Sequence, residues 1–324
     1  MKTAAKNSAA PTPATPGGAG APPEKGLGAR GVTLSYGGEP VVRDVTLDLP
    51  HGGLTVIIGP NGCGKSTLLK GYGRILKPEQ GTFHLHGTDL HAYRGKEAAR
   101  HVALLPQSPV APEGITVRDL VRRGRYPHHT LLRQWSPDDD RAIAFALDRT
   151  GLTELAEEQA GQLSGGQRQR AWIAMVLAQE TELLLLDEPT TFLDIAHQYD
   201  LLELCAELNR EGRTIVAVLH DLNQAARFAS HLVVMDRGEV YAQGAPEEVM
   251  TAELVRQVFG LACDIAPDPR TGTPAADPQP PPPAPPAPAR APGVALRRRP
   301  PGPPATPIGP VASTRIRPFR IRRR

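Results

Sequence analysis

The stretch Gly59-Pro60-Asn61-Gly62-Cys63-Gly64-Lys65-Ser66-Thr67 decides how this chain is interpreted. It fits the pattern G-x-x-x-x-G-K-[ST], follows the apolar run Leu54–Ile58, and opens a segment that favours a helix. In this pattern backbone N–H groups close around phosphate oxygens, the lysine reaches the β- and γ-phosphates, and the serine hydroxyl ligates Mg²⁺. The stretch therefore predicts a nucleotide-binding loop, and the order of its glycines disfavours the dinucleotide pattern GxGxxG.

Two adjacent acids follow a second apolar run, Leu183–Leu186. Like charges side by side disfavour each other, so one role for each acid is the economical interpretation. Asp187 is predicted to hold Mg²⁺, and Glu188 to act as the base for an attacking water. The alternative is an ordinary hydrated strand end, which the phosphate loop makes less attractive.

Polar side chains also follow two further apolar runs. His220 follows Thr214–Leu219, and Gln107 follows Val102–Leu105. Because ligands of parallel α/β sheets gather at the carboxyl ends of strands, His220 is predicted to contact the γ-phosphate, and Gln107 the metal or the water. The alternative for His220 is a structural histidine, and Gln107 alone would carry no argument.

Tyr36 ends an early strand pattern in a chain with few aromatic residues. It is a candidate for stacking on an adenine ring, and an ordinary strand aromatic is the alternative.

A second anion-binding turn is predicted in Leu163-Ser164-Gly165-Gly166-Gln167-Arg168-Gln169-Arg170. Its Ser-Gly-Gly opens a segment rich in helix formers, from Gln167 to Gln179. Backbone N–H groups at a helix start attract anions, and a serine hydroxyl adds a donor. A chain with one phosphate loop has no evident use for this turn by itself.

Composition divides the 324 residues into three parts. Residues 1–29 and 279–324 are poor in large apolar side chains and are predicted to be disordered, which leaves 30–278 as the folded unit. The overall charge is +3, yet the arginine-rich end hides a net charge of −7 between residues 30 and 260. An acidic core argues against specific nucleic-acid binding.

The cysteines and the apolar runs indicate a cytosolic protein. Cys63, Cys205 and Cys263 form no CxxC, no apolar run approaches the roughly 18 residues of a membrane span, and the N-terminus lacks the apolar part of a secretory signal.

The fold class follows from the alternation of apolar strands with helical patterns, which predicts an α/β protein with a parallel sheet covered on both faces. Gly31–Tyr36 and Val41–Leu49 predict an antiparallel sheet, and residues between Gln107 and Ser164 are mostly helical in pattern.

These motifs, in this order, resemble the ATP-binding subunits of ABC transporters over about residues 30–265. The resemblance implies a P-loop NTPase of ABC type: a mostly parallel core, an antiparallel β subdomain, and an α-helical subdomain at about 108–172. It also implies that Ser164, Gly165, Gly166 and Gln167 face the ATP held by a second ATPase subunit, most simply an identical one. Further expected partners are an integral permease and, through it, a substrate-binding protein, at the cytoplasmic face of the inner membrane.

A finer resemblance concerns the cargo. Gly124–His128, Thr190–Gln198 and Val249–Gly260 resemble importers of ferric siderophores, with cobalamin and haem importers as alternatives. Gly124–His128 is expected to contact the permease. A soluble ABC ATPase acting on nucleic acid or ribosomes is the alternative of another class, and a P-loop kinase would leave the Leu163–Gln167 motif unexplained.

Three features lie outside the resemblance. Ala275-Ala276-Asp277 stands where the family has an apolar strand. Residues 279–324 hold ten arginines and no acid, and anionic lipid is a candidate partner for them. His84, His86 and His91 suggest a metal site, but no cysteine or carboxylate stands at ligand spacing, so none is predicted.

Overall fold

The computed structural model describes residues 25–130, 135–191 and 193–280. The segments predicted to be disordered lie outside these residues, except for 25–29 and 279–280. The chain divides into two units after Gln279, and the elements below all belong to the first.

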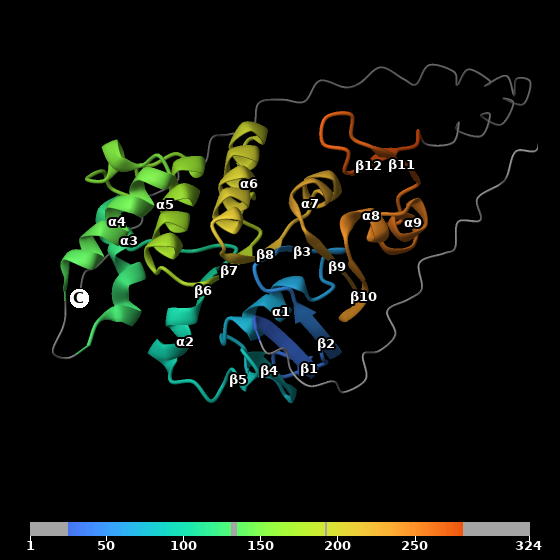
Figure 1. Cartoon of the computed structure of the whole chain (residues 1–324), viewed down its shortest axis with the longest axis horizontal. Coiled ribbons are helices and arrows are strands. Elements are labelled where there is room, and N and C mark those ends of the chain that lie inside the picture. The colour runs from blue at the N-terminus through green and yellow to red at the C-terminus, as the bar shows by residue number, and fades with distance from the viewer. Residues whose placement is uncertain (1–24, 131–134, 192, 281–324) are drawn as a thin grey trace, which may run out of the picture. The chain divides into compact units, whose positions relative to one another are not determined.

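A six-stranded sheet forms the centre of this unit (Figure 1), in the order β10-β9-β3-β8-β7-β6. Its strands are β3 (Leu54–Ile58), β6 (Val102–Leu105), β7 (Leu183–Asp187), β8 (Thr214–Val218), β9 (His231–Asp236) and β10 (Glu239–Gly244). All neighbouring strands are parallel except β9 and β10, which form an antiparallel hairpin with Arg237 and Gly238 between them. The predicted parallel sheet is confirmed.

Both faces of this sheet are buried, as continuous apolar strands require. A separate hydrophobic core covers each face, and alternate residues of a strand belong to different cores. In β7, Leu184 and Leu186 belong to the first core, and Leu183 and Leu185 to the second. The first core contains the side chains of α5, α6 and α9, whereas the second contains those of α1 and the antiparallel sheet.

The antiparallel sheet has the order β2-β1-β4-β5. Its strands are β1 (Leu27–Leu34), β2 (Val42–Leu49), β4 (Gln80–Leu85) and β5 (Thr88–Asp89). The predicted boundary at residue 30 was wrong by three residues, because Leu27 pairs with both Leu49 and Leu85 and is fully buried.

Helices surround the two sheets. They are α1 (Lys65–Tyr72), α2 (Gly95–His101), α3 (Val117–Arg122), η1 (Arg123–His128), α4 (Pro137–Arg149), η2 (Thr153–Leu155), α5 (Gly165–Ala178), α6 (Ile195–Arg210), α7 (Leu222–Phe228), α8 (Pro246–Val249) and α9 (Ala252–Phe259). α3, α4 and α5 pack together as the expected helical region, although α5 runs six residues past the predicted limit of 172.

The end of the first unit contains a two-stranded sheet of β11 (Cys263–Pro267) and β12 (Pro274–Pro278). Ala275-Ala276-Asp277 therefore forms a strand although it lacks large apolar side chains. Asn223 of α7 holds it in place: its side chain donates to the carbonyl of Ala276 and accepts from the Ala276 N–H.

Candidate nucleotide-binding site

The phosphate loop joins β3 to α1, as predicted. All three of its glycines have backbone angles that other residues rarely adopt: φ is +152° at Gly59, +78° at Gly62 and +104° at Gly64. A Cβ on Gly59 would also lie 2.2 Å from the carbonyl oxygen of Met235. Any other residue at position 59 would thus displace the loop from β9.

Lys65 lies buried beneath this loop. Its Nζ donates to the carbonyl oxygens of Gly59 and Pro60 at 2.8 and 3.0 Å and lies 4.0 Å from the sulfur of Cys63. Within the described residues no carboxylate forms an ion pair with it. A buried ammonium held only by dipoles favours an incoming anion, so this loop fits a nucleotide phosphate.

Asp187 and Ser66 form the second part of the site. The Ser66 hydroxyl donates to Oδ1 of Asp187 at 2.7 Å, across the gap between α1 and the end of β7. Burial raises the pKa of Asp187; the Ser66 hydrogen bond opposes the rise and the negative charge of Glu188 adds to it. A hydroxyl and a carboxylate oxygen side by side are the oxygen ligands that Mg²⁺ takes in nucleotide sites, so these two residues fit that ion.

Glu188 lies between the two other residues predicted for the chemistry. Gln107 Nε2 donates to its Oε2 at 2.6 Å, and His220 Nε2 lies 2.8 Å from its Oε1. Because β6, β7 and β8 are parallel neighbours, the residues that follow their carboxyl ends meet here, as predicted. Gln107 contacts Glu188 but neither Ser66 nor Asp187. No contact in the structure therefore supports its predicted role as a metal ligand.

Glu188 also has an uncommon backbone, with φ at +51°. Such a conformation in a residue other than glycine is held by its surroundings and is typical of functional sites. Thr191 supplies part of this support: its N–H donates to the Glu188 carbonyl and its hydroxyl lies 3.4 Å from Oε2. From the sequence, Thr191 was placed in the segment Thr190–Gln198, but no contact between it and Glu188 was predicted.

Tyr36 lies near the phosphate loop with 62% of its surface exposed. Its hydroxyl is 3.4 Å from that of Thr67, and Lys70 Nζ lies 5.8 Å from the centre of the ring. An exposed ring beside the loop is available for stacking, and the adenine contact stays a prediction.

The Ser164–Gln167 turn begins α5, as expected. Ser164 and Gln167 bond each other reciprocally: the Gln167 N–H donates to the Ser164 hydroxyl, and the Ser164 N–H donates to the Gln167 side-chain oxygen. Ser164 and Gly165 are exposed, and among the described residues no hydrogen bond joins the turn to the phosphate loop. The turn thus has an ordered, exposed cap, and it makes no hydrogen bond to this chain's own phosphate loop within the described residues.

The interpretation of Gly124–His128 as a contact surface was largely wrong. Arg125 is buried, and its guanidinium bonds Asp139, Glu180 and the carbonyl of Ala178. A Cβ on Gly124 would lie 2.1 Å from the Met175 carbonyl oxygen. The segment therefore ties η1 to α4 and α5, and its one large exposed side chain is Tyr126, under Lys96.

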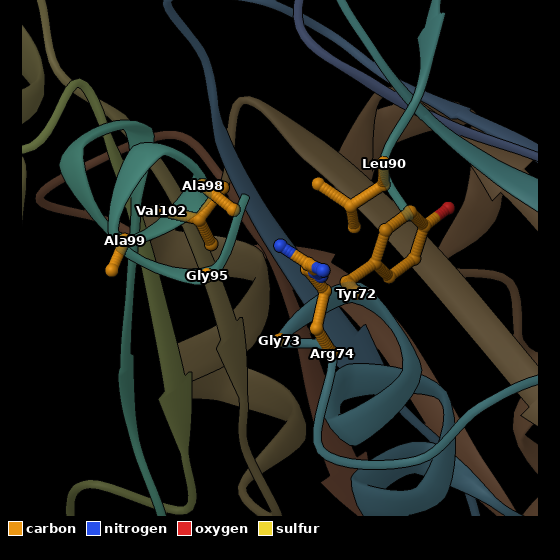
Figure 2. Close-up of a pocket in the computed structure, with 8 residues that line it drawn as sticks. All are labelled: Tyr72, Gly73, Arg74, Leu90, Gly95, Ala98, Ala99 and Val102. Carbon is orange, nitrogen blue, oxygen red and sulfur yellow. The ribbon is translucent and has the colours of Figure 1, made fainter. Parts of the chain in front are cut away.

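A cavity of about 320 Å³ lies away from these residues. It is lined by Tyr72, Gly73, Arg74, Leu90, Gly95, Ala98, Ala99 and Val102. Figure 2 shows the Arg74 guanidinium in the opening between Leu90 on one side and α2 on the other. It holds none of the residues predicted to bind nucleotide.

Among the described residues, no helix has the length and apolar character needed to cross a membrane.

The fold and the site together define a P-loop nucleotide-binding protein. Residues 42–191 match the ABC transporter family. The chain is 54% identical over 248 residues to the ferric enterobactin transport ATP-binding protein FepC of Escherichia coli, covering 76% of this chain and 92% of that protein. It is 49% identical over 242 residues to the iron(3+)-hydroxamate import ATP-binding protein FhuC of Bacillus subtilis, covering 74% and 90%.

A more distant relative is the cobalamin import ATP-binding protein BtuD of Halobacterium salinarum, 39% identical over 256 residues and covered to 64% of its length. The dimeric structure of the bacterial ABC transporter cassette MJ0796 matches with a TM-score of 0.61 at 28% identity, covering 68% of this chain and 98% of that one. The chain belongs to the ABC transporter family, and it is an ATP-binding ATPase of that family.

Proposed function

We propose that this chain hydrolyses ATP to drive an ABC importer of ferric siderophores. The proposal of ATP hydrolysis rests on one group of side chains at the ends of β3 and β7: Lys65, Ser66, Asp187 and Glu188. The observation that carries the cargo is the resemblance to importers named for iron complexes, which exceeds the resemblance to the cobalamin protein.

The site residues divide the chemistry between them. The phosphate loop, Gly59 to Thr67, holds the phosphates with its N–H groups and the Lys65 ammonium, and Tyr36 stacks on the adenine. Ser66 and Asp187 would hold Mg²⁺, which would supply positive charge beside the transferring phosphate. Glu188 takes the proton of the attacking water, while His220 and Gln107 orient the water and the γ-phosphate.

A second copy completes each site. The exposed Ser164 hydroxyl and the N–H groups of Gly165 and Gly166 stand at the start of a helix of 14 residues, where an anion is favoured. Since the turn has no bond to its own loop, it faces the γ-phosphate bound by the partner ATPase. The proposed assembly is a homodimer with two composite sites, and the dimeric cassette among the similar structures supports it.

The dimer docks on an integral permease at the cytoplasmic face of the inner membrane, and a substrate-binding protein delivers cargo from the other side. Tyr126 and Trp135 are exposed aromatic side chains at the helical region and are candidate permease contacts. The arginine-rich end, outside the described residues, is proposed to bind anionic lipid.

Growth under iron limitation tests the cargo. A strain that lacks this chain should fail to grow when a ferric siderophore is its sole iron source. Wild-type protein should restore growth, and the Lys65→Ala variant should not. Normal growth on the siderophore, with loss of cobalamin or haem uptake instead, would assign the protein to a sister group of importers. ATPase activity of the purified chain tests the enzymatic half separately.

A further inference from the structure

Three metal-ligating side chains from separate elements meet at the edge of the sheet opposite the nucleotide site. They are His86, directly after β4; His101, the last residue of α2; and Glu182, directly before β7. His86 Nε2 lies 2.7 Å and His101 Nδ1 2.9 Å from the same oxygen, Oε1 of Glu182. One ligand atom from each side chain lies within 4.8 Å of the others.

The surroundings leave this cluster open on one side. The side chains of His86, His101 and Glu182 are 26%, 38% and 38% exposed. His51 and Tyr93 stack against the two imidazoles with ring centres 6.1 and 5.8 Å away. Burial raises the pKa of Glu182, but hydrogen bonds from His86 and His101 outweigh it and lower the pKa, so the carboxylate is ionised at neutral pH.

We propose that His86, His101 and Glu182 bind one divalent late transition-metal ion, of which Zn²⁺ is the probe. Two imidazole nitrogens and one carboxylate oxygen suit Zn²⁺, whereas Mg²⁺ prefers oxygen ligands alone. Bonds of about 2.0–2.1 Å to Zn²⁺ in a tetrahedron place donor atoms somewhat over 3 Å apart, so the present spacing needs only a small opening. Solvent on the exposed side supplies the fourth ligand.

Metal binding would move the ring proton of His86. The Gly26 N–H donates to Nδ1 of His86 at 3.0 Å, which places the proton of the neutral ring on Nε2. Metal binding needs that Nε2 lone pair, so the proton moves to Nδ1 and the Gly26 bond is lost, at a cost of up to about tenfold in affinity.

The location separates this site from nucleotide binding and connects it to the same strands. His101 and Glu182 immediately precede Val102 and Leu183, which pair as the first residues of β6 and β7. The other ends of those two strands lead to Gln107 and to Asp187 and Glu188. An ion at this edge would tie α2 and β4 to the starts of the strands that position the nucleotide site.

Zn²⁺ titration of the untagged, nucleotide-free full chain tests the proposal. We expect one Zn²⁺ per chain by calorimetry, binding at least about tenfold weaker in His101→Gln and Glu182→Gln, each of which removes a ligand. The matched control is His84→Gln, which removes a histidine two residues from His86 and should bind as wild type does. Mg²⁺ should not compete.

Thermal unfolding gives a readout that does not depend on activity. Zn²⁺ should raise the melting temperature of wild type and His84→Gln but not that of the two ligand variants, since only a folded site binds the ion. The proposal fails if wild type binds no stoichiometric Zn²⁺, or if wild type and both ligand variants bind it equally.

Discussion

Glu188→Gln separates the role of Glu188 as a base from its role in holding the site together. The carboxylate accepts one bond from Gln107 and contacts His220 through its other oxygen. A glutamine of the same shape keeps both contacts, because its amide oxygen accepts from Gln107 and its NH₂ donates to the His220 ring nitrogen. The variant loses only the lone pair that takes a proton from water.

The expected magnitudes differ sharply between rate and stability. Removing a general base costs about 10²–10⁴ in rate, or roughly 3–5 kcal/mol in the activation barrier. With both contacts kept, the free energy of unfolding should change little. Glu188→Ala, in contrast, should also lose about 1–3 kcal/mol of stability, because both hydrogen-bonded contacts disappear.

Three measurements check this reasoning: single-turnover ATP hydrolysis, MgATP binding, and gel filtration with and without ATP. The Glu188→Gln chain should bind MgATP, hydrolyse it slowly, and accumulate as an ATP-bound dimer. Hydrolysis within about tenfold of wild type would remove Glu188 from the role of base. Loss of MgATP binding would show that the side chain acts mainly by holding the site.

Four further predictions test other parts of the molecule. Mixing Lys65→Ala with Ser164→Arg chains should restore part of the ATPase activity, because the mixed dimer keeps one intact composite site; no recovery in demonstrated mixed dimers would contradict the trans arrangement. Arg125→Met should lower the free energy of unfolding in urea by about 3–5 kcal/mol, because it removes the guanidinium that pairs with the buried carboxylate of Asp139. Burial opposes ionisation of Asp139, but its bonds to Arg125 and Ser136 lower its pKa. The resulting stabilisation is present above the ordinary pKa of 3.8 and should be lost as the pH falls through the lowered value. Urea midpoints measured against pH would detect this loss. Truncation after Pro278 should weaken binding to anionic liposomes at low salt and leave ATPase activity unchanged, and equal binding would exclude the lipid contact.

The parts of the fold that the sequence could predict depend on local signals. The α4 helix begins after Ser136 with Pro137 at its first position and Asp139 at its third, which is a complete start signal, and the structure has it there. The edge shared by Gln107, Glu188 and His220 was also predictable, since parallel strands present their ends together.

The parts that could not be predicted depend on contacts between distant residues. The sequence alone indicates a surface position for Arg125. Only the packing of α5 brings Ala178 and Glu180 to its guanidinium. His86 and Glu182 are 96 positions apart, so their contact has no spacing signal. A search for a carboxylate close to His86 in the sequence therefore missed Glu182, which is close to it only in the folded chain.

The contacts of Glu188 connect it to the helical region. Both carboxylate oxygens are engaged in this structure, one by Gln107 with Thr191 nearby, and the other by His220. Gln107 and Thr191 also line a hollow of about 250 Å³ with Gly165, Arg168 and Gln169 of α5. The two side chains that contact Oε2 of Glu188 therefore also face α5, so a displacement of α5 would reach Glu188 through them.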